Sequence, residues 1–335
     1  MKTCMYAAAA VGGSLMAAAL PPASAQSTQI YGQVRLTANS ISGAGAVKEL
    51  RDNASRLGFR GTEDLGGGLG AFFGLEMGIS ADDGSGTDPL YRNSYTGLRG
   101  SFGAIALGRL DSSNPTGSPL YSQVTSIVSF AANDAGATAI GTTILNGRNR
   151  TSNSIGYMSP NWGGFDVRAR YYVRGAPATP NVENGAKSLD LGFNYANGPL
   201  RAGIGFARDS RPGGLLANEF SDKWQAGVRY AFGPVAPYVL VGKDSYKNTA
   251  TSRGEVGYWI VGAKYSQNAH SVVLNFMERD VQTSRSGKRK REQLAYAYAL
   301  SKRTELQAFI DRDGVDSSRR NVAVRAIGVG MRHDF

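Results

Sequence analysis

Arginines that alternate with apolar residues are the chemically most suggestive feature of the chain. Leu57 and Phe59 fall on one face of an extended segment, and Arg56 and Arg60 fall on the other. A glycine-rich turn follows, and the returning arm carries Glu76 opposite a row of apolar residues. The guanidinium group keeps its charge at any physiological pH. The pattern therefore predicts fixed positive charge along a wall, which attracts anions.

Other arginines share this placement. Arg150 falls on the same face as Ser152 and Ser154, opposite Ile155 and Tyr157. Arg92 opens its predicted strand, and the further arginines on polar faces are Arg35, Arg168, Arg170 and Arg174. For one arginine, an ion pair with a nearby carboxylate explains the charge equally well. For several of them in a basic chain, we favour ion selectivity.

Other kinds of chemistry find little support. Two histidines, His270 and His333, are too few for a usual metal cluster. His333 also has the parity of a lipid-facing residue, so a nucleophile–base pair is disfavoured. The glycines of 66–70 are not followed by the Lys-Ser/Thr of a phosphate loop. The sequence thus predicts no enzyme, no metal and no cofactor.

The run Lys288–Arg291 is basic, but nucleic acid is an improbable partner for an exported protein. We predict a solvated extracellular loop there, with lipopolysaccharide phosphate contact or anion capture at the channel mouth as the weaker alternative.

An export signal opens the chain. Lys2, an apolar stretch over 5–20 and Ala23-Ser24-Ala25 before Gln26 predict a signal peptide over 1–25, cleaved after export through the Sec pathway. The only cysteine, Cys4, lies in that segment, so the mature chain has no disulfide. The full chain carries 37 Lys and Arg against 26 Asp and Glu, a net charge of +11.

Strand-like alternation continues to the last residue. The candidate strands are 28–37, 55–63, 69–79, 91–100, 104–110, 150–159, 165–174, 187–196, 200–208, 222–232, 236–244, 255–266, 270–280, 291–300, 305–313 and 324–335. Short glycine- or asparagine-containing turns alternate with longer polar connections. An even strand number with this alternation of connections is typical of a transmembrane barrel. The sequence therefore predicts an all-β fold, a transmembrane antiparallel β-barrel of sixteen strands, as one domain over 26–335.

One long connection, 109–149, breaks the regular spacing. It is poor in charge, with Arg109, Asp111 and Asp134 among its few charged residues, and it contains many apolar side chains. Loops of this length inside a compact domain are usually functional or disordered. We predict that it folds into the barrel and narrows the channel as a constriction loop.

Several segments resemble the general porins of the neisserial and related beta-proteobacterial type. These segments are 55–66 (SRLGFRGTEDLG), 92–98 (RNSYTGL), 150–160 (RTSNSIGYMSP) and 330–335 (GMRHDF). The resemblance covers the mature chain end to end. It implies a trimeric, sixteen-stranded porin of the Gram-negative outer membrane whose third extracellular loop forms an eyelet. Few acidic residues occur in the loop here, which weakens the expectation of a transverse field from loop carboxylates.

The resemblance also assigns residues. Arg56, Arg92 and Arg150 match the wall arginines that line the eyelet of anion-selective members, with Arg35 and Arg60 extending the row. Phe335 matches the terminal aromatic recognised by the barrel-assembly machinery. Expected partners are two further copies of the chain, small hydrophilic solutes and anions, and lipopolysaccharide or other outer-membrane lipid.

We therefore predict an outer-membrane porin for passive diffusion of small hydrophilic solutes and ions, with a preference for anions. A substrate-specific channel for organic acids or phosphate on the same barrel is the first alternative. A barrel that serves mainly as an adhesin or enzyme is the second.

Overall fold

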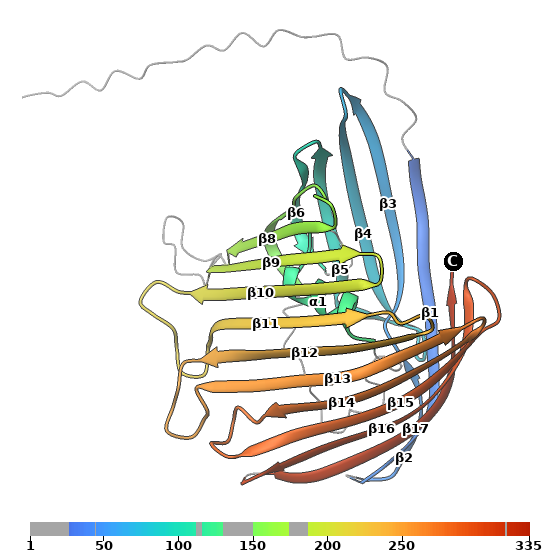
Figure 1. Ribbon diagram of the computed structural model, residues 1–335, viewed down its shortest axis with the longest axis vertical. Helices are drawn as coiled ribbons and strands as arrows, with labels where there is room; N and C mark the ends of the chain where they lie inside the picture. The colour runs from blue at the N-terminus through green and yellow to red at the C-terminus, as the bar shows by residue number, and fades with distance from the viewer. Residues whose placement is uncertain (1–26, 44, 112–115, 130–149, 174–186, 319) are drawn as a thin grey trace, which may run out of the picture.

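A single antiparallel β-sheet, closed on itself, forms the molecule in the computed structural model (Figure 1). The structure describes residues 27–43, 45–111, 116–129, 150–173, 187–318 and 320–335. The strands are β1 (Ser27–Ser42), β2 (Val47–Asp52), β3 (Ser55–Gly66), β4 (Leu69–Ser80), β5 (Ser85–Gly100), β6 (Gly103–Leu110), β7 (Thr151–Met158), β8 (Phe165–Val173), β9 (Lys187–Asn197), β10 (Leu200–Ser210), β11 (Phe220–Tyr230), β12 (Val235–Tyr246), β13 (Glu255–Gln267), β14 (His270–Asp280), β15 (Gly287–Ala299), β16 (Thr304–Ser317) and β17 (Arg320–Asp334).

β2 and β3 are two halves of one barrel strand. Both pair with β1, with Val47–Asp52 on its second half and Arg56–Thr62 on its first. The break lies at Asn53 and Ala54, where Ala54 has a φ of 63°. Counted this way the barrel has sixteen strands, and pairing of β1 with β17 closes it. The predicted strand number is confirmed, and among the described residues each of these barrel strands has a paired neighbour on both sides, as a barrel in lipid requires.

The two faces of the wall differ as a barrel in lipid requires. On β12 and β13, Val241 and Val261 are exposed on the outer face, whereas Leu240 and Ile260 are buried on the inner face. Aromatic pairs such as Phe165–Tyr195, with ring centroids 4.4 Å apart, lie at the short-turn end of the outer face. Such an apolar band with aromatic girdles is the lipid-facing surface of a transmembrane barrel.

Short turns join the strands at one end of the barrel. β3 and β4 are linked by Gly67 and Gly68, whose φ angles of 60° and 79° are those of a type I′ hairpin turn. Longer connections gather at the other end, which is the extracellular end of a barrel of this kind.

The basic run Lys288–Arg291 lies within β15, so the prediction of an exposed loop there was wrong. The strand continues because Arg289 and Arg291 point inward and form ion pairs with Asp313 and Asp311 of β16. Lys288 and Lys290 of the same run point outward.

The described part of the long connection contains a helix, α1 (Pro119–Ile127). Ser118 caps it by accepting a hydrogen bond from the Tyr121 N–H at 3.2 Å. Val124 and Ile127 pack in one buried cluster with Leu240 of β12 and other inner-face residues. α1 thus lies against the inner face of the wall (Figure 1). Among the described residues, no helix has the length and apolar character needed to cross a membrane.

Candidate functional site: an arginine cluster on the inner wall

Glu76 of β4 anchors one half of the site. The Arg92 Nε lies 3.0 Å from Glu76 Oε1, and the Arg56 Nε lies 3.6 Å from Glu76 Oε2. Tyr31 of β1 donates its hydroxyl hydrogen to Oε2 at 3.1 Å. One buried carboxylate therefore fixes two guanidinium groups from neighbouring strands.

A β-bulge explains how Arg92 reaches this position. Glu76 faces Asn93 across the β4–β5 ladder and Met77 faces Tyr91, so Arg92 is the extra residue. A bulge redirects a side chain out of the regular alternation. Alternation alone could therefore not place Arg92 on a face, and only the family resemblance identified it.

Asp111 anchors the other half, at the two ends of the long connection. Asp111 follows β6 and Arg150 precedes β7, and the Arg150 Nε lies 2.6 Å from Asp111 Oδ2. The Arg92 Nη2 lies 3.7 Å from the same oxygen, which joins the two halves into one cluster. The parity argument for Arg150 ran through Asn153, whose φ of 54° interrupts regular extended backbone. The pairing with Asp111, not the alternation, places Arg150 here.

The carboxylates of this cluster are less exposed to solvent than the arginines. The side chains of Glu76 and Asp111 are 3% and 4% exposed, whereas Arg56 and Arg150 are 30% and 31% exposed. Three guanidinium groups face two carboxylates in this cluster, a formal excess of one positive charge. The water in the barrel therefore contacts arginine, with the carboxylates behind.

Arg35 and Arg60 belong to the same side of the wall, and their hydrogen-bond partners are neutral. Arg35 Nε donates to Gln307 Oε1 and Arg60 Nε donates to Gln29 Oε1, each at 3.0 Å. The Arg60 guanidinium also lies 4.7 Å from the centre of the Tyr31 ring, a cation–π contact. A neutral amide orients a guanidinium without cancelling its charge.

Several other wall cations are balanced by carboxylates, whereas Arg229 of β11 donates to the neutral Ser129 Oγ at 2.9 Å. Arg170, fully buried, donates from Nε to Asp190 Oδ2 at 3.1 Å, and Arg168 lies 2.8 Å from Asp166. Further inward pairs missed by the sequence analysis are Lys223–Asp244, Arg279–Asp244, Arg289–Asp313 and Arg291–Asp311. The available signal was an inward-facing Asp on the next strand, or, for Arg279 of β14, on β12, two strands away.

Arg109 lies apart from the cluster. Its Nη1 donates to Ser152 Oγ at 2.8 Å, and the β5–β6 ladder pairs it with Ser94. Asp134 and Arg174 lie outside the described residues, as does the predicted signal peptide. Within the described ranges, no group of three or more His, Cys, Asp or Glu side chains is arranged to hold a metal ion.

Comparison with known proteins decides the family. The model of the Gram-negative porin family matches residues 7–318. The chain belongs to the Gram-negative porin family. Outer membrane porin protein 32 of Delftia acidovorans is 32% identical over 262 residues, which cover 76% of this chain and 72% of that protein. Major outer membrane protein P.IB of Neisseria gonorrhoeae is 30% identical over 196 residues, covering 55% and 52%.

Solved structures give the same fold. An anion-selective porin from Comamonas acidovorans has a TM-score of 0.72 at 26% identity, covering 93% of this chain and 100% of that one. OmpT of Vibrio cholerae has a TM-score of 0.69 at 14% identity, covering 95% and 100%, a likeness of fold alone. This porin therefore resides in the outer membrane and forms a channel through it for small solutes and ions.

Proposed function

We propose that this porin admits small hydrophilic solutes by passive diffusion and prefers anions, with Arg56, Arg92 and Arg150 as its selectivity residues. The observation that carries the proposal is that Glu76 and Asp111 are buried while Arg56 and Arg150 remain accessible, with Arg92, 14% exposed, joining the two carboxylates. Fixed charge in a narrow passage with low-dielectric walls focuses its potential and concentrates the counter-ion. The Comamonas acidovorans relative is itself an anion-selective porin.

The long connection 109–149 is proposed to narrow the channel. α1 within it packs on the inner face, with its Gln123 side-chain amide donating to the Ile204 carbonyl of β10 at 2.8 Å. A loop held to one wall, with Arg56, Arg92 and Arg150 on β3, β5 and before β7, leaves the solute path between them. Arg109, Asp111 and Asp134 would then be the charged residues of this loop.

A general channel fits better than the alternatives. The two histidines are exposed and engaged at the short-turn end, with His270 Nδ1 2.8 Å from Tyr296 Oη and His333 Nδ1 2.9 Å from Thr304 Oγ1. Neither is paired with a buried nucleophile, so we propose that the protein is not an enzyme. A specific channel for organic acids or phosphate would differ by conductance that saturates with one solute.

The export signal and the terminal aromatic residue suggest how the porin is assembled in the outer membrane. We propose that residues 1–25 are removed after Sec export, that the barrel-assembly machinery recognises Phe335, and that three copies form the native channel. Lipopolysaccharide is the proposed lipid partner.

The decisive test is the reversal potential of the reconstituted channel in a salt gradient. Changing Arg56, Arg92 and Arg150 together to Ser should lower the anion-to-cation permeability ratio by about tenfold, most strongly at low salt, because screening lengths are then longest. The matched control changes the outward-facing Lys288, Lys290 and Arg312 to Ser, which removes the same charge from the other face. A larger shift in the control than in the wall variant would refute the assignment.

A further inference from the structure

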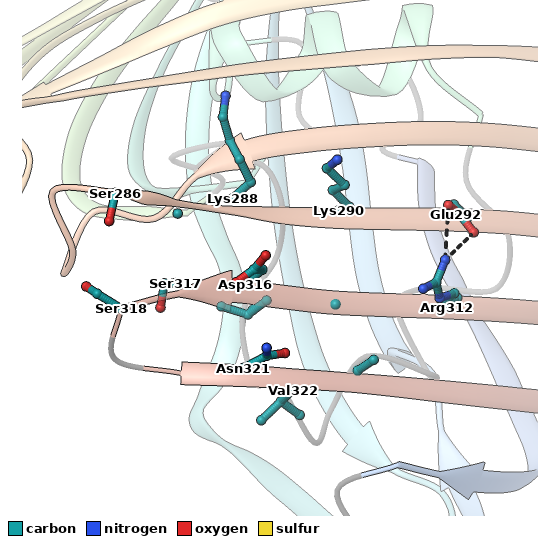
Figure 2. A pocket seen from close by; sticks show the side chains of 14 residues that line it. Ser286, Lys288, Lys290, Glu292, Arg312, Asp316, Ser317, Ser318, Asn321 and Val322 are labelled. Carbon is teal, nitrogen blue, oxygen red and sulfur yellow. Dashed lines mark hydrogen bonds and ion pairs between the residues drawn. The ribbon is translucent and has the colours of Figure 1, made fainter.

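A cavity of about 500 Å³ opens on the outer face of the barrel, over β15, β16 and β17 (Figure 2). It lies beside the β14–β15 and β16–β17 connections, and therefore at the extracellular end. Its charged lining residues are Lys288, Lys290, Glu292, Arg312 and Asp316. Because it faces away from the channel, solutes in the pore do not reach it.

Small residues create the hollow. Gly314 of β16 pairs with Ala323 of β17 on one side and with Lys290 of β15 on the other. A Cβ added at Gly314 would meet nothing closer than 3.8 Å. The floor of the cavity is thus two adjacent small residues, and Lys290 and Arg312 extend from its edges (Figure 2).

The charges around this floor are poorly matched. Arg312 lies directly opposite Arg325 in the β16–β17 ladder, on the same outward face. Like charges directly opposite each other destabilise a strand pair. Arg312 is held to Glu292 only at 3.4 Å, and no carboxylate of the described chain pairs with Arg325.

Lys290 adds a third accessible cation. Its side chain is 68% exposed, and its ammonium lies 3.6 Å from Glu278. Lys288, in contrast, is paired twice, with Glu278 at 3.0 Å and Asp280 at 2.9 Å. An anion seated in the cavity between Lys290 and Arg312 would offset the repulsion between Arg312 and Arg325, which lies beside the cavity.

The position of the cavity along the barrel axis indicates which kind of anion would bind there. In the ladder, the next outward positions toward the short-turn end are Leu294, Ile310 and Ile327, which pair across β15, β16 and β17. All three are strongly exposed and apolar, as lipid-facing residues are. The cavity therefore sits where the hydrocarbon region ends and lipid headgroups begin.

We propose that this cavity binds the phosphate of a lipid headgroup in the outer leaflet, with the acyl chains lying along Leu294, Ile310 and Ile327. The ligand class is a phosphorylated glycolipid, in which a phosphate monoester contacts Lys290 and Arg312 of the cavity lining. The inference gives a site to the lipopolysaccharide contact proposed above, and it does not depend on the ion preference of the channel.

The test uses the assembled porin in mild detergent and measures retention of added lipid A by native mass spectrometry. The double variant Lys290→Glu/Arg312→Glu should retain lipid A about tenfold less, because each basic residue near a charged lipid surface contributes to binding. Gly314→Leu should lose retention as well, by filling the cavity without changing charge. Arg208→Glu, an exposed outward-facing cation on β10, is the matched control and should retain lipid A as the unaltered porin does.

Each alternative has its own result. Equal loss in Arg208→Glu means general charge attraction, and equal retention of phosphatidylcholine means an acyl-chain groove without phosphate recognition. Dissociation of the assembled porin by the double variant, with lipid retention unchanged, identifies the cavity as a contact between copies. Any of these three outcomes overturns the proposal. The reversal potential of both cavity variants should equal that of the unaltered channel, so failure here is separable from failure of the selectivity assignment.

Discussion

Two classes of arginine line the barrel, and their partners separate them. Arg170 and Arg291 are buried against aspartates of the neighbouring strand, so each adds almost no net charge to the lumen. Arg35 and Arg60 bind neutral amides, and the cluster of Arg56, Arg92 and Arg150 shares two carboxylates among three cations. Positive charge without a carboxylate partner of its own therefore lies on β1, β3, β5 and the ends of the long connection, and also at Arg229 of β11.

The carboxylate of Glu76 sets how large that excess is. Replacing Glu76 by Gln keeps the size and the acceptor for Tyr31 but removes one negative charge from the cluster. We expect the anion-to-cation permeability ratio to rise, and unfolding stability to fall by about 1–3 kcal/mol because buried partners lose charge-assisted bonds.

Reversal potential and urea unfolding measure the two effects. Glu292→Gln, the same change at an exposed outward-facing carboxylate, is the control and should alter neither. A lower anion preference in Glu76→Gln would show that this carboxylate does not oppose the arginines.

The sequence was enough to identify the arginines of this cluster, but not to identify the carboxylates that pair with them. Alternation assigns a face wherever the backbone is regular, and it did so correctly for Arg56 opposite Leu57. It could not assign Arg92 or Arg150, because a bulge and a left-handed Asn153 interrupt the alternation there. Which aspartate neutralises which arginine depends on strand register, which local pattern does not contain.

At the scale of elements, the strands were predictable and their extracellular ends were not. All sixteen strands were predicted near their observed positions. Parts of some strands were nevertheless missed. These parts are β2, which is one half of a barrel strand, and the first part of β5, and the basic start of β15 was predicted to be a loop. Beyond the lipid band both faces of a strand are polar, so the apolar–polar alternation that reveals a strand disappears.

α1 is held by a glutamine inserted among glycines. The Gln123 side chain lies close to Gly203 and Gly205 of β10, and its oxygen accepts from Gln225 Nε2 at 3.1 Å. Gln225 also donates to the Leu120 carbonyl at 2.7 Å. Side chains at those glycines would displace the helix from the wall.

Gln123→Ala should therefore loosen the long connection. A buried hydrogen-bond partner left unsatisfied costs about 1–3 kcal/mol, enough to populate detached positions of the helix. We expect larger open-channel current noise and altered single-channel conductance in planar bilayers. Gln33→Ala removes a buried inner-face glutamine of β1 whose amide donates to the Ala54 carbonyl, away from α1, and it should leave the noise unchanged. Equal noise in both variants would contradict an anchoring role for Gln123.

The whole molecule depends on the seam where its two ends meet. Phe335 and Gly32 exchange backbone hydrogen bonds, each of 3.1 Å, at the end of the β1–β17 pairing. The Phe335 ring covers Gly32 so closely that a Cβ there would meet it at 2.5 Å. The last residue of the chain thus completes the closure of the barrel.

Deleting Phe335 should reduce the amount of folded, heat-modifiable porin in the outer membrane without reducing synthesis. The physical reason is the loss of two closing hydrogen bonds, in addition to the aromatic recognition that we propose. Phe335→Leu keeps the backbone bonds and removes the aromatic ring, so it separates the two contributions. Undiminished levels in both variants, measured by gel mobility before and after heating, would exclude a role for Phe335 in assembly.

The uneven distribution of paired and unpaired charge in the wall also affects solvent. If the channel prefers anions as we propose, mobile anions balance the fixed excess of the arginine cluster and outnumber cations in the lumen. Under an applied voltage these anions would drag water with them, and the channel would act as an electroosmotic pump. An uncharged sugar, which no arginine attracts, would then cross faster in the direction of anion flow than against it.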